Sequence, residues 1–212
     1  MTTFSLRVNE SCSSTFYFEA TGRYLDECAD RAPTGEQHCP ICGRKLRKHG
    51  RYFRSVVFGQ LLERLPVYRY LCPKCHKTFS LLPAFLRPYS HFGLCVREAA
   101  ARLLGGGDKV DAVAGRLCRS NAAGGISGRT LRRWLQGWRQ RARALTEVVI
   151  ERILCLTPGF DVTPYLPQAN RPRGWLWSVL ALGEILQGLI RGAKTIPLFV
   201  FLNLSYSIHV SP

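Results

Sequence analysis

The alternation of apolar and polar positions predicts strands in the first half of the chain and helices in the second. Residues 51–58 (RYFRSVVF) and 61–71 (LLERLPVYRYL) are rich in β-branched and aromatic side chains, which is typical of strands. Gly59-Gln60 separates them and predicts the turn of a β-hairpin. Ahead of it, residues 14–20 (STFYFEA) predict a further short strand, and residues 31–37 (RAPTGEQ) predict a polar linker.

Helical periodicity begins near Leu94 and recurs in two further segments. The glycines at 105–107 end the first helix, and the loop at 120–125 (SNAAGG) follows the second. The third helix starts near Ser127 and ends before Pro158. The expected apolar faces are, in order, Val96, Ala99, Ala100 and Leu103; Val110, Val113, Ala114 and Leu117; and Leu131, Trp134, Leu135 and Trp138.

Two stretches flank these helices. Residues 80–93 (SLLPAFLRPYSHFG) contain prolines and aromatic residues, which predict an irregular connector. Near the C-terminus, the apolar run from Trp175 to Leu204 is interrupted by Glu184 and Gln187. A membrane span needs about 20 consecutive apolar residues, so we expect no span there. The pattern instead favours a packed or interfacial helix followed by a strand-like segment at residues 196–204 (IPLFVFLNL).

Two Cys-x-x-C pairs, CPIC and CPKC, carry the clearest chemistry in the sequence. Such turns point two thiolates at one centre, and two of them complete the closed four-sulfur shell of a structural zinc ion. The hairpin between the pairs is the arrangement of a zinc ribbon. A complete shell needs no histidine and leaves no open position for catalysis. The predicted ligands of one structural Zn²⁺ are Cys39, Cys42, Cys72 and Cys75.

These patterns predict an α+β fold. The four-Cys zinc ribbon is followed by a small helical, helix-turn-helix-like domain and a short apolar C-terminal segment. The expected bounds are 1–37 for the N-terminal segment, 38–82 for the ribbon, 93–156 for the helical domain and 157–212 for the C-terminal segment.

Charge adds a partner to this picture. The chain has 30 Lys and Arg against 14 Asp and Glu, a net charge of +16. Most of the basic residues lie between Cys39 and Leu145, so the excess belongs to one region and indicates a polyanionic partner. The N-terminus has no secretory pattern. The cysteines number nine, an odd count, so a disulfide framework is not expected, and we expect reduced thiols and a cytoplasmic location.

The third helix predicts how that partner is bound. Its polar side is rich in arginine, whose planar fork binds phosphate oxygens or guanine bidentately. An ordinary solvated face is the alternative. The second and third helices are separated by more residues than the tight turn of a helix-turn-helix. The expected DNA-binding residues are Lys45, Arg47, Lys48, Arg51 and Arg54 on the ribbon and Arg129, Thr130, Arg132, Arg133 and Arg139 on the helix.

A family resemblance agrees with this interpretation. The stretch HCPICGRKLRKHGRYFR…YRYLCPKCHKTFSLLP, followed by SGRTLRRWLQGW, resembles the N-terminal zinc-ribbon and helix-turn-helix region of insertion-sequence transposases. It also resembles short bacterial proteins that carry only that region. The resemblance covers about residues 38–145 and implies recognition of DNA. After Leu145 the acidic residues are too few, and the segment too short, for an RNase H-like domain, so we expect no catalytic activity.

Other functions remain open at this stage. An RNA-binding or ribosome-associated ribbon protein would stack unpaired bases on aromatic residues. Its candidates are Tyr52, Phe53, Tyr68 and Tyr70. A nuclease or transposase with an unrecognised active site is a further alternative. The apolar residues 175–204 are a candidate surface for a homo-oligomer or another protein.

Overall fold

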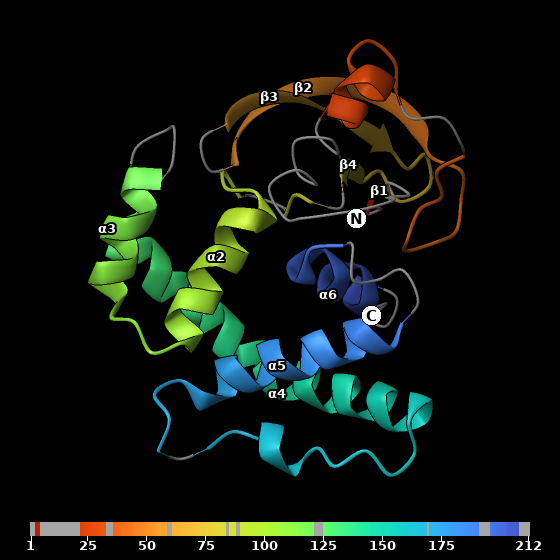
Figure 1. Ribbon diagram of the computed structural model, residues 1–212. Coiled ribbons are helices and arrows are strands. Elements are labelled where there is room, and N and C mark those ends of the chain that lie inside the picture. The colour runs from red at the N-terminus through yellow and green to blue at the C-terminus, as the bar shows by residue number, and fades with distance from the viewer. Residues whose placement is uncertain are drawn as a thin grey trace.

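The computed structural model describes residues 3–4, 22–32, 36–58, 61–83, 85–87, 90–120, 125–168, 170–190 and 196–207. A curved β-sheet forms one layer, and a group of helices lies beneath it (Figure 1). The predicted turn at Gly59-Gln60 and the predicted strand at residues 14–20 lie outside the described residues.

The predicted hairpin is confirmed, and a third antiparallel strand extends it. Strands β2 (Arg47–Phe58) and β3 (Leu61–Leu71) pair in a register that runs from Arg47↔Leu71 to Phe58↔Leu61. Strand β4 (Thr78–Pro83) pairs antiparallel with β3, and β1 (Thr3–Phe4) pairs parallel with β4. The sheet order is therefore β1-β4-β3-β2.

The prediction of an irregular connector over residues 80–93 is wrong for its first part. Residues 80–83 belong to β4, where Leu81 and Leu82 are buried. Pairing with β3 decides this, because it satisfies the backbone hydrogen bonds of the segment. Pro83 lies at the strand's end, where a missing N–H does little harm.

A short helix at residues 22–28 packs on the sheet and was not expected from the sequence. Tyr24 is 1% exposed, and its hydroxyl donates a hydrogen bond to the Pro66 carbonyl at 2.6 Å. The Tyr68 hydroxyl donates to the carbonyl of Cys28 at 2.8 Å. These two tyrosines fix the helix to β3. The helix is too short for its sequence periodicity to predict it.

The three predicted helices are present. They are α2 (Leu94–Gly105), α3 (Val110–Ser120) and α4 (Gly128–Leu156). The Ser127 hydroxyl accepts a hydrogen bond from the Thr130 N–H, which caps α4 at the predicted start. The apolar faces of α3 and α4 are confirmed as buried or half-buried.

The predicted face of α2 is confirmed for Val96, Ala100 and Leu103, which are buried or half-buried, and is wrong for Ala99. Ala99 is exposed, while Ala101 and Leu104 are buried. The helix is turned this way because it contacts both α5 (Gly174–Leu189) and α6 (Leu198–Ser207). A single apolar face read from the sequence does not indicate that a helix packs against two neighbours.

The C-terminal part contains a confirmed helix and a corrected one. Helix α5 is the predicted packed helix and lies along α4. The predicted strand over residues 196–204 is wrong, because most of it lies in α6. The buried carboxylate of Glu98 accepts a hydrogen bond from the Phe199 N–H at 3.0 Å, which satisfies a free donor in the first turn of α6.

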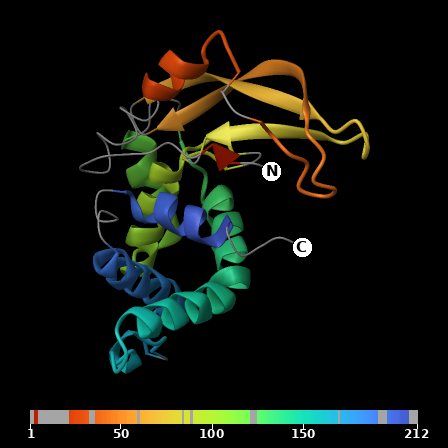
Figure 2. The same ribbon diagram turned by 90° about the vertical axis from the view of Figure 1, so that its right-hand side faces the viewer.

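Two apolar clusters underlie the two layers. One lies beneath the sheet and includes Val56, Leu65, Val67 and Phe85. The other lies among helices α2 to α6. Helix α6 contributes to both, which joins the layers (Figure 2).

In the part of the chain that the structure describes, no helix is both long enough and apolar enough to cross a membrane.

Candidate metal centre and nucleic-acid interface

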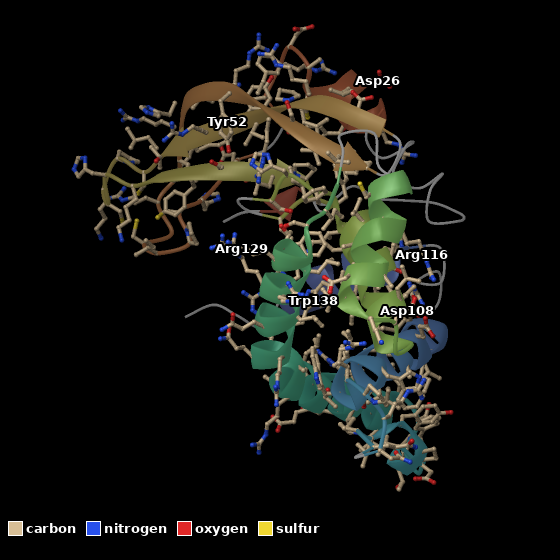
Figure 3. The ribbon with its side chains drawn as sticks, turned by 90° about the vertical axis from the view of Figure 1, so that its left-hand side faces the viewer. Asp26, Tyr52, Asp108, Arg116, Arg129 and Trp138 are labelled. Atoms are coloured by element: carbon tan, nitrogen blue, oxygen red, sulfur yellow. The ribbon has the colours of Figure 1, made fainter. Side chains whose placement is uncertain are left out.

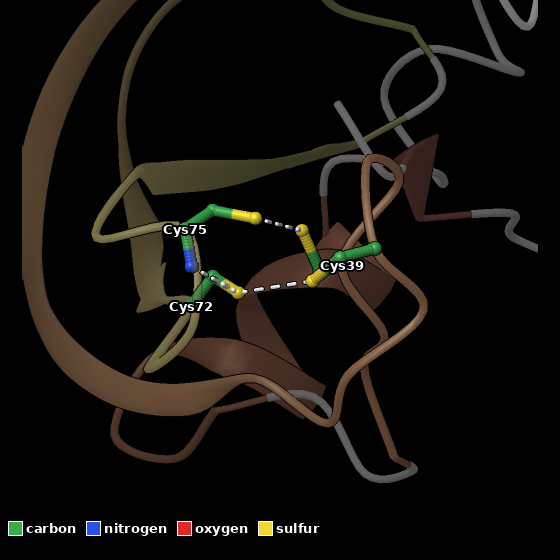
Figure 4. A group of neighbouring side chains, drawn as sticks. Cys39, Cys72 and Cys75 are labelled. Atoms are coloured by element: carbon green, nitrogen blue, oxygen red, sulfur yellow. Dashed lines mark hydrogen bonds between the residues drawn. The ribbon is translucent and has the colours of Figure 1, made fainter.

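The four predicted cysteines converge on one point. Their sulfur atoms all lie within 4.8 Å of one another. The Sγ atoms of Cys39 and Cys75 are 4.0 Å apart, and those of Cys42 and Cys72 are 3.5 Å apart (Figure 4). A tetrahedral zinc ion with Zn–S bonds of about 2.3 Å separates its ligands by about 3.8 Å. The sulfur positions therefore fit such an ion.

The two Cys-x-x-C turns have the same backbone geometry. The Gly43 N–H donates to the Cys39 carbonyl at 2.9 Å, and the His76 N–H donates to the Cys72 carbonyl at 3.0 Å. The first residue of each turn also donates its N–H to a carbonyl five residues later, at 2.8 and 2.9 Å. Gly43 and His76 both adopt positive φ angles, 69° and 53°. This repetition shows that each turn is shaped to present its two thiols together.

The left-handed backbone has a different cost in the two turns. Glycine adopts positive φ without strain, whereas a residue with a Cβ atom does so at about 1–2 kcal/mol. Gly43 supplies the conformation freely, and His76 holds it against that cost. His76 is exposed, and the four sulfurs leave it no ligand role.

Electrostatics favours a cation between the sulfurs. Burial raises the pKa of the Cys72 thiol, but hydrogen bonds from the N–H groups of Cys75 and Lys74 and from the neighbouring thiols outweigh it and lower the pKa to about 7. The pKa of Cys75 rises to about 12, chiefly because its thiol bonds to Cys42. Each thiolate disfavours ionisation of the neighbouring thiols, because their negative charges repel one another. Four thiolates at this spacing therefore need a positive ion among them.

The centre lies where the sheet ends. Cys72 follows the last residue of β3, and the first cysteine pair precedes β2. Cys39 and Cys72 are buried, whereas Cys42 and Cys75 are half-buried. The sulfurs thus join the two strands of the hairpin at its open end.

The basic residues predicted on the ribbon divide into two groups. Arg47 and Lys48 are exposed on β2. Arg51 and Arg54 instead donate to the carbonyls of Ala29, at 2.6 Å, and Ser90, at 2.5 Å. Burial lowers the pKa of Arg54. These two arginines hold neighbouring segments against the sheet, whereas Lys45 pairs with Glu36 ahead of β2, and both of these side chains are exposed.

The helical candidates also divide. Arg129, Arg133 and Arg139 are exposed along α4, and no ion pair joins them to another described residue. Arg132 lies 3.2 Å from the Asp111 carboxylate on α3. A Cβ atom added at Gly128 would lie 2.7 Å from the same carboxylate, so α3 and α4 meet closely at their N-terminal turns.

The ribbon and the start of α4 face the same side of the molecule. In Figures 2 and 3, which show opposite sides of the molecule, the end of the sheet that carries the cysteine turns projects to the same side as the N-terminal half of α4. In Figure 1 these two parts lie at opposite ends of the molecule. In Figure 3, Arg129 lies at the start of α4 on the side towards which the hairpin projects. The basic hairpin and the start of α4, far apart in sequence, therefore lie towards one side of the molecule, at separate places on it.

The hairpin also exposes two aromatic rings. Tyr52 is 40% exposed and Phe53 is 46% exposed, whereas Tyr68 and Tyr70 are buried. The guanidinium carbon of Arg64 lies 4.8 Å from the centre of the Phe53 ring. Sequence reasoning did not single out Arg64. The hairpin register could have indicated it. Arg64 pairs with Ser55, so it lies diagonally across the strands from Phe53.

Comparison with known proteins adds one match. A family model described as a domain of unknown function, DUF6431, matches residues 39–134. The matched region includes both cysteine pairs and ends within α4. No curated protein and no solved structure matches the chain.

Proposed function

We propose that this protein is a zinc-dependent DNA-binding protein, related to the DNA-recognition region of insertion-sequence transposases. One observation carries the proposal. The four-sulfur cluster ends a basic hairpin on the same side of the molecule as the exposed arginines that begin α4.

The zinc ion has a structural role in this proposal. Cys39, Cys42, Cys72 and Cys75 would hold it, and it would supply positive charge that lets all four sulfurs remain thiolates. Four protein ligands leave no position for water or substrate. The ion's contribution would be to the folding of the ribbon.

The basic residues would bind DNA in two ways. Arg47 and Lys48 on the hairpin would contact phosphates, which positions the protein without reading sequence. Arg129 and Arg133 would enter the major groove as a recognition helix does. Arg132 would orient α4 through its pair with Asp111, so its role differs from that of its exposed neighbours.

The test is selection of duplex fragments from a pooled genomic library by the zinc-loaded protein at two salt concentrations. We expect a discrete sequence to be retained at the higher salt, with log affinity falling by about 0.9 per phosphate contact for each tenfold rise in salt. Binding of all fragments alike, or of none, would contradict sequence-specific recognition.

Variants assign the contacts. Arg129→Ala and Arg133→Ala should weaken binding to the selected site by roughly tenfold to a hundredfold and relax its specificity. The matched control is Arg143→Ala. This side chain is 92% exposed on the same helix, about 21 Å along the axis from Arg129 and about 15 Å from Arg133, and pairs with Glu147. Equal losses in all three variants would mean that only net charge matters.

Exposure of Tyr52 and Phe53 favours a second candidate, the binding of single-stranded RNA. Aromatic rings beside arginines stack unpaired bases of any sequence. Competition between single-stranded RNA and duplex DNA decides between the two functions. Preference for RNA, lost in Phe53→Ala but kept in Arg133→Ala, would favour the second.

A further inference from the structure

A cavity of about 110 Å³ lies among α2, α4, α5 and α6, away from the cysteine centre. Its walls are mostly apolar, and its largest side chains are Trp138, Trp175 and Phe199. Leucines from α2, α4, α5 and α6 complete the walls. Such a lining is typical of a site for the apolar part of a small ligand.

Arginines gather at this cavity. Arg87 and Arg141 belong to its lining, in which no described residue is acidic. Arg97 lies beside them, with its guanidinium carbon 4.7 Å from the Trp134 ring centre and 5.7 Å from that of Trp138. Trp138 therefore contacts both the cavity and the cation.

Arg97 has a buried donor that is not satisfied. Its Nε atom is buried without a hydrogen-bond partner among the described residues. Burial, together with the charges of Arg87 and Arg141, lowers the pKa of Arg97 to about 10. Glu98, the next residue, accepts hydrogen bonds from Arg102 and from the Phe199 N–H. Like charges at the edge of an apolar cavity favour an anion there.

We propose that this cavity binds a small amphipathic carboxylate, with its apolar chain against Trp138 and Trp175 and its carboxylate on Arg141, an arginine of the lining. A guanidinium binds a carboxylate through two parallel hydrogen bonds. A cavity of about 150 Å³ holds benzene, so a volume of about 110 Å³ suits a short chain. Nothing in this site takes part in the proposed binding of nucleic acid.

The test uses the full-length zinc-loaded protein and hexanoate as the probe. Calorimetry measures binding, and the fluorescence of Trp138 and Trp175 reports occupancy of the cavity. We expect saturable binding at one site and a raised melting temperature. Hexan-1-ol and hexylamine carry the same chain without the negative charge, and each should bind at least tenfold more weakly.

Two variants and a control locate the site. Arg141→Met should weaken hexanoate binding at least tenfold, and Ala142→Phe should abolish it by filling the cavity. Arg143→Met removes an exposed arginine of the same helix that faces Glu147, and it should leave the affinity within twofold. Circular dichroism verifies that each variant is folded. Arg141 is exposed, so its variant stays informative if Ala142→Phe does not fold.

Three results would overturn the proposal. One is the absence of saturable hexanoate binding to the wild-type protein at millimolar concentration. Another is equal binding of hexan-1-ol, or an unchanged affinity in Arg141→Met. The third is a dimer in sedimentation whose cavity is closed to hexanoate, which would assign this face to a second copy of the chain. Since no nucleic acid is present, these results are independent of the proposed function.

Discussion

Replacement of Cys39 by serine is the sharpest test of the metal centre. The cysteine is 3% exposed, and its Sγ lies 4.0 Å from that of Cys75. Its backbone N–H and carbonyl make the hydrogen bonds that close the first turn, and serine retains both. The substitution therefore removes one sulfur ligand and leaves the fold of the turn otherwise intact.

The magnitude follows from the number of ligands. Structural zinc contributes about 10–16 kcal/mol in zinc-finger peptides near pH 7. Divided over four sulfurs, this is about 3 kcal/mol for each, or more than a hundredfold in zinc affinity. Competition with a chromophoric chelator measures the loss. Thermal unfolding should show the sheet melting earlier, while the helical signal persists because the helices have their own apolar cluster.

Cys155→Ser is the matched control. Cys155 is exposed on α4 and lies outside the sulfur cluster, so zinc content and melting should match the wild-type protein. The reasoning is refuted if the wild-type protein purifies with less than one zinc ion and its melting does not respond to added zinc. It is also refuted if Cys39→Ser and Cys155→Ser bind zinc equally.

Three further substitutions test other parts of the structure. Gly43→Ala should lower the free energy of unfolding by about 1 kcal/mol, and His76→Gly should raise it by somewhat less, because both positions have positive φ. Urea denaturation measures both changes. Changes of the same sign in the two variants would contradict the argument. Glu98→Ala should lower the free energy of unfolding by about 2–4 kcal/mol in the same assay, because Arg102 and the first turn of α6 lose their buried carboxylate partner. The control is Glu147→Ala, at an exposed pair, which should lower it by less than about 0.5 kcal/mol. Burial raises the pKa of Tyr24 well above its ordinary value, so this tyrosine ionises first in the unfolded state. The free energy of unfolding should therefore fall as pH rises above about 10, by up to about 1.4 kcal/mol per pH unit. Tyr24→Phe should lack this fall, and identical pH profiles of the two proteins would refute the argument.

Most features that the sequence predicted correctly can be recognised from short patterns in the chain. Two Cys-x-x-C pairs around a β-rich stretch indicated a hairpin closed by four sulfurs. Ser127 and the spacing from Leu131 to Trp138 indicated where α4 begins and which side it buries. For each Cys-x-x-C turn and for α4, hydrogen bonds within a few residues or a period of 3.6 determine the local structure, whereas the two cysteine pairs meet across about thirty residues.

Contacts between distant segments decided the rest. Residues 80–83 became a strand because β3 offered hydrogen-bond partners, and residues 198–207 became a helix whose first turn is satisfied by Glu98, about a hundred residues earlier. The same apolar residues suit either structure when read alone. Packing also decided which aromatic rings stay exposed.

The cavity and its arginines belong wholly to the tertiary structure. Arg87, Arg97 and Arg141 occupy three separate segments, and nothing in their local sequence relates them. They become neighbours because α2 and α4 pack against α5 and α6 around a space that their side chains leave unfilled. The sequence alone determined which four cysteines converge and where most helices lie. Only burial and the meeting of distant charges determined which arginines hold the fold together, which face solvent and which surround a cavity.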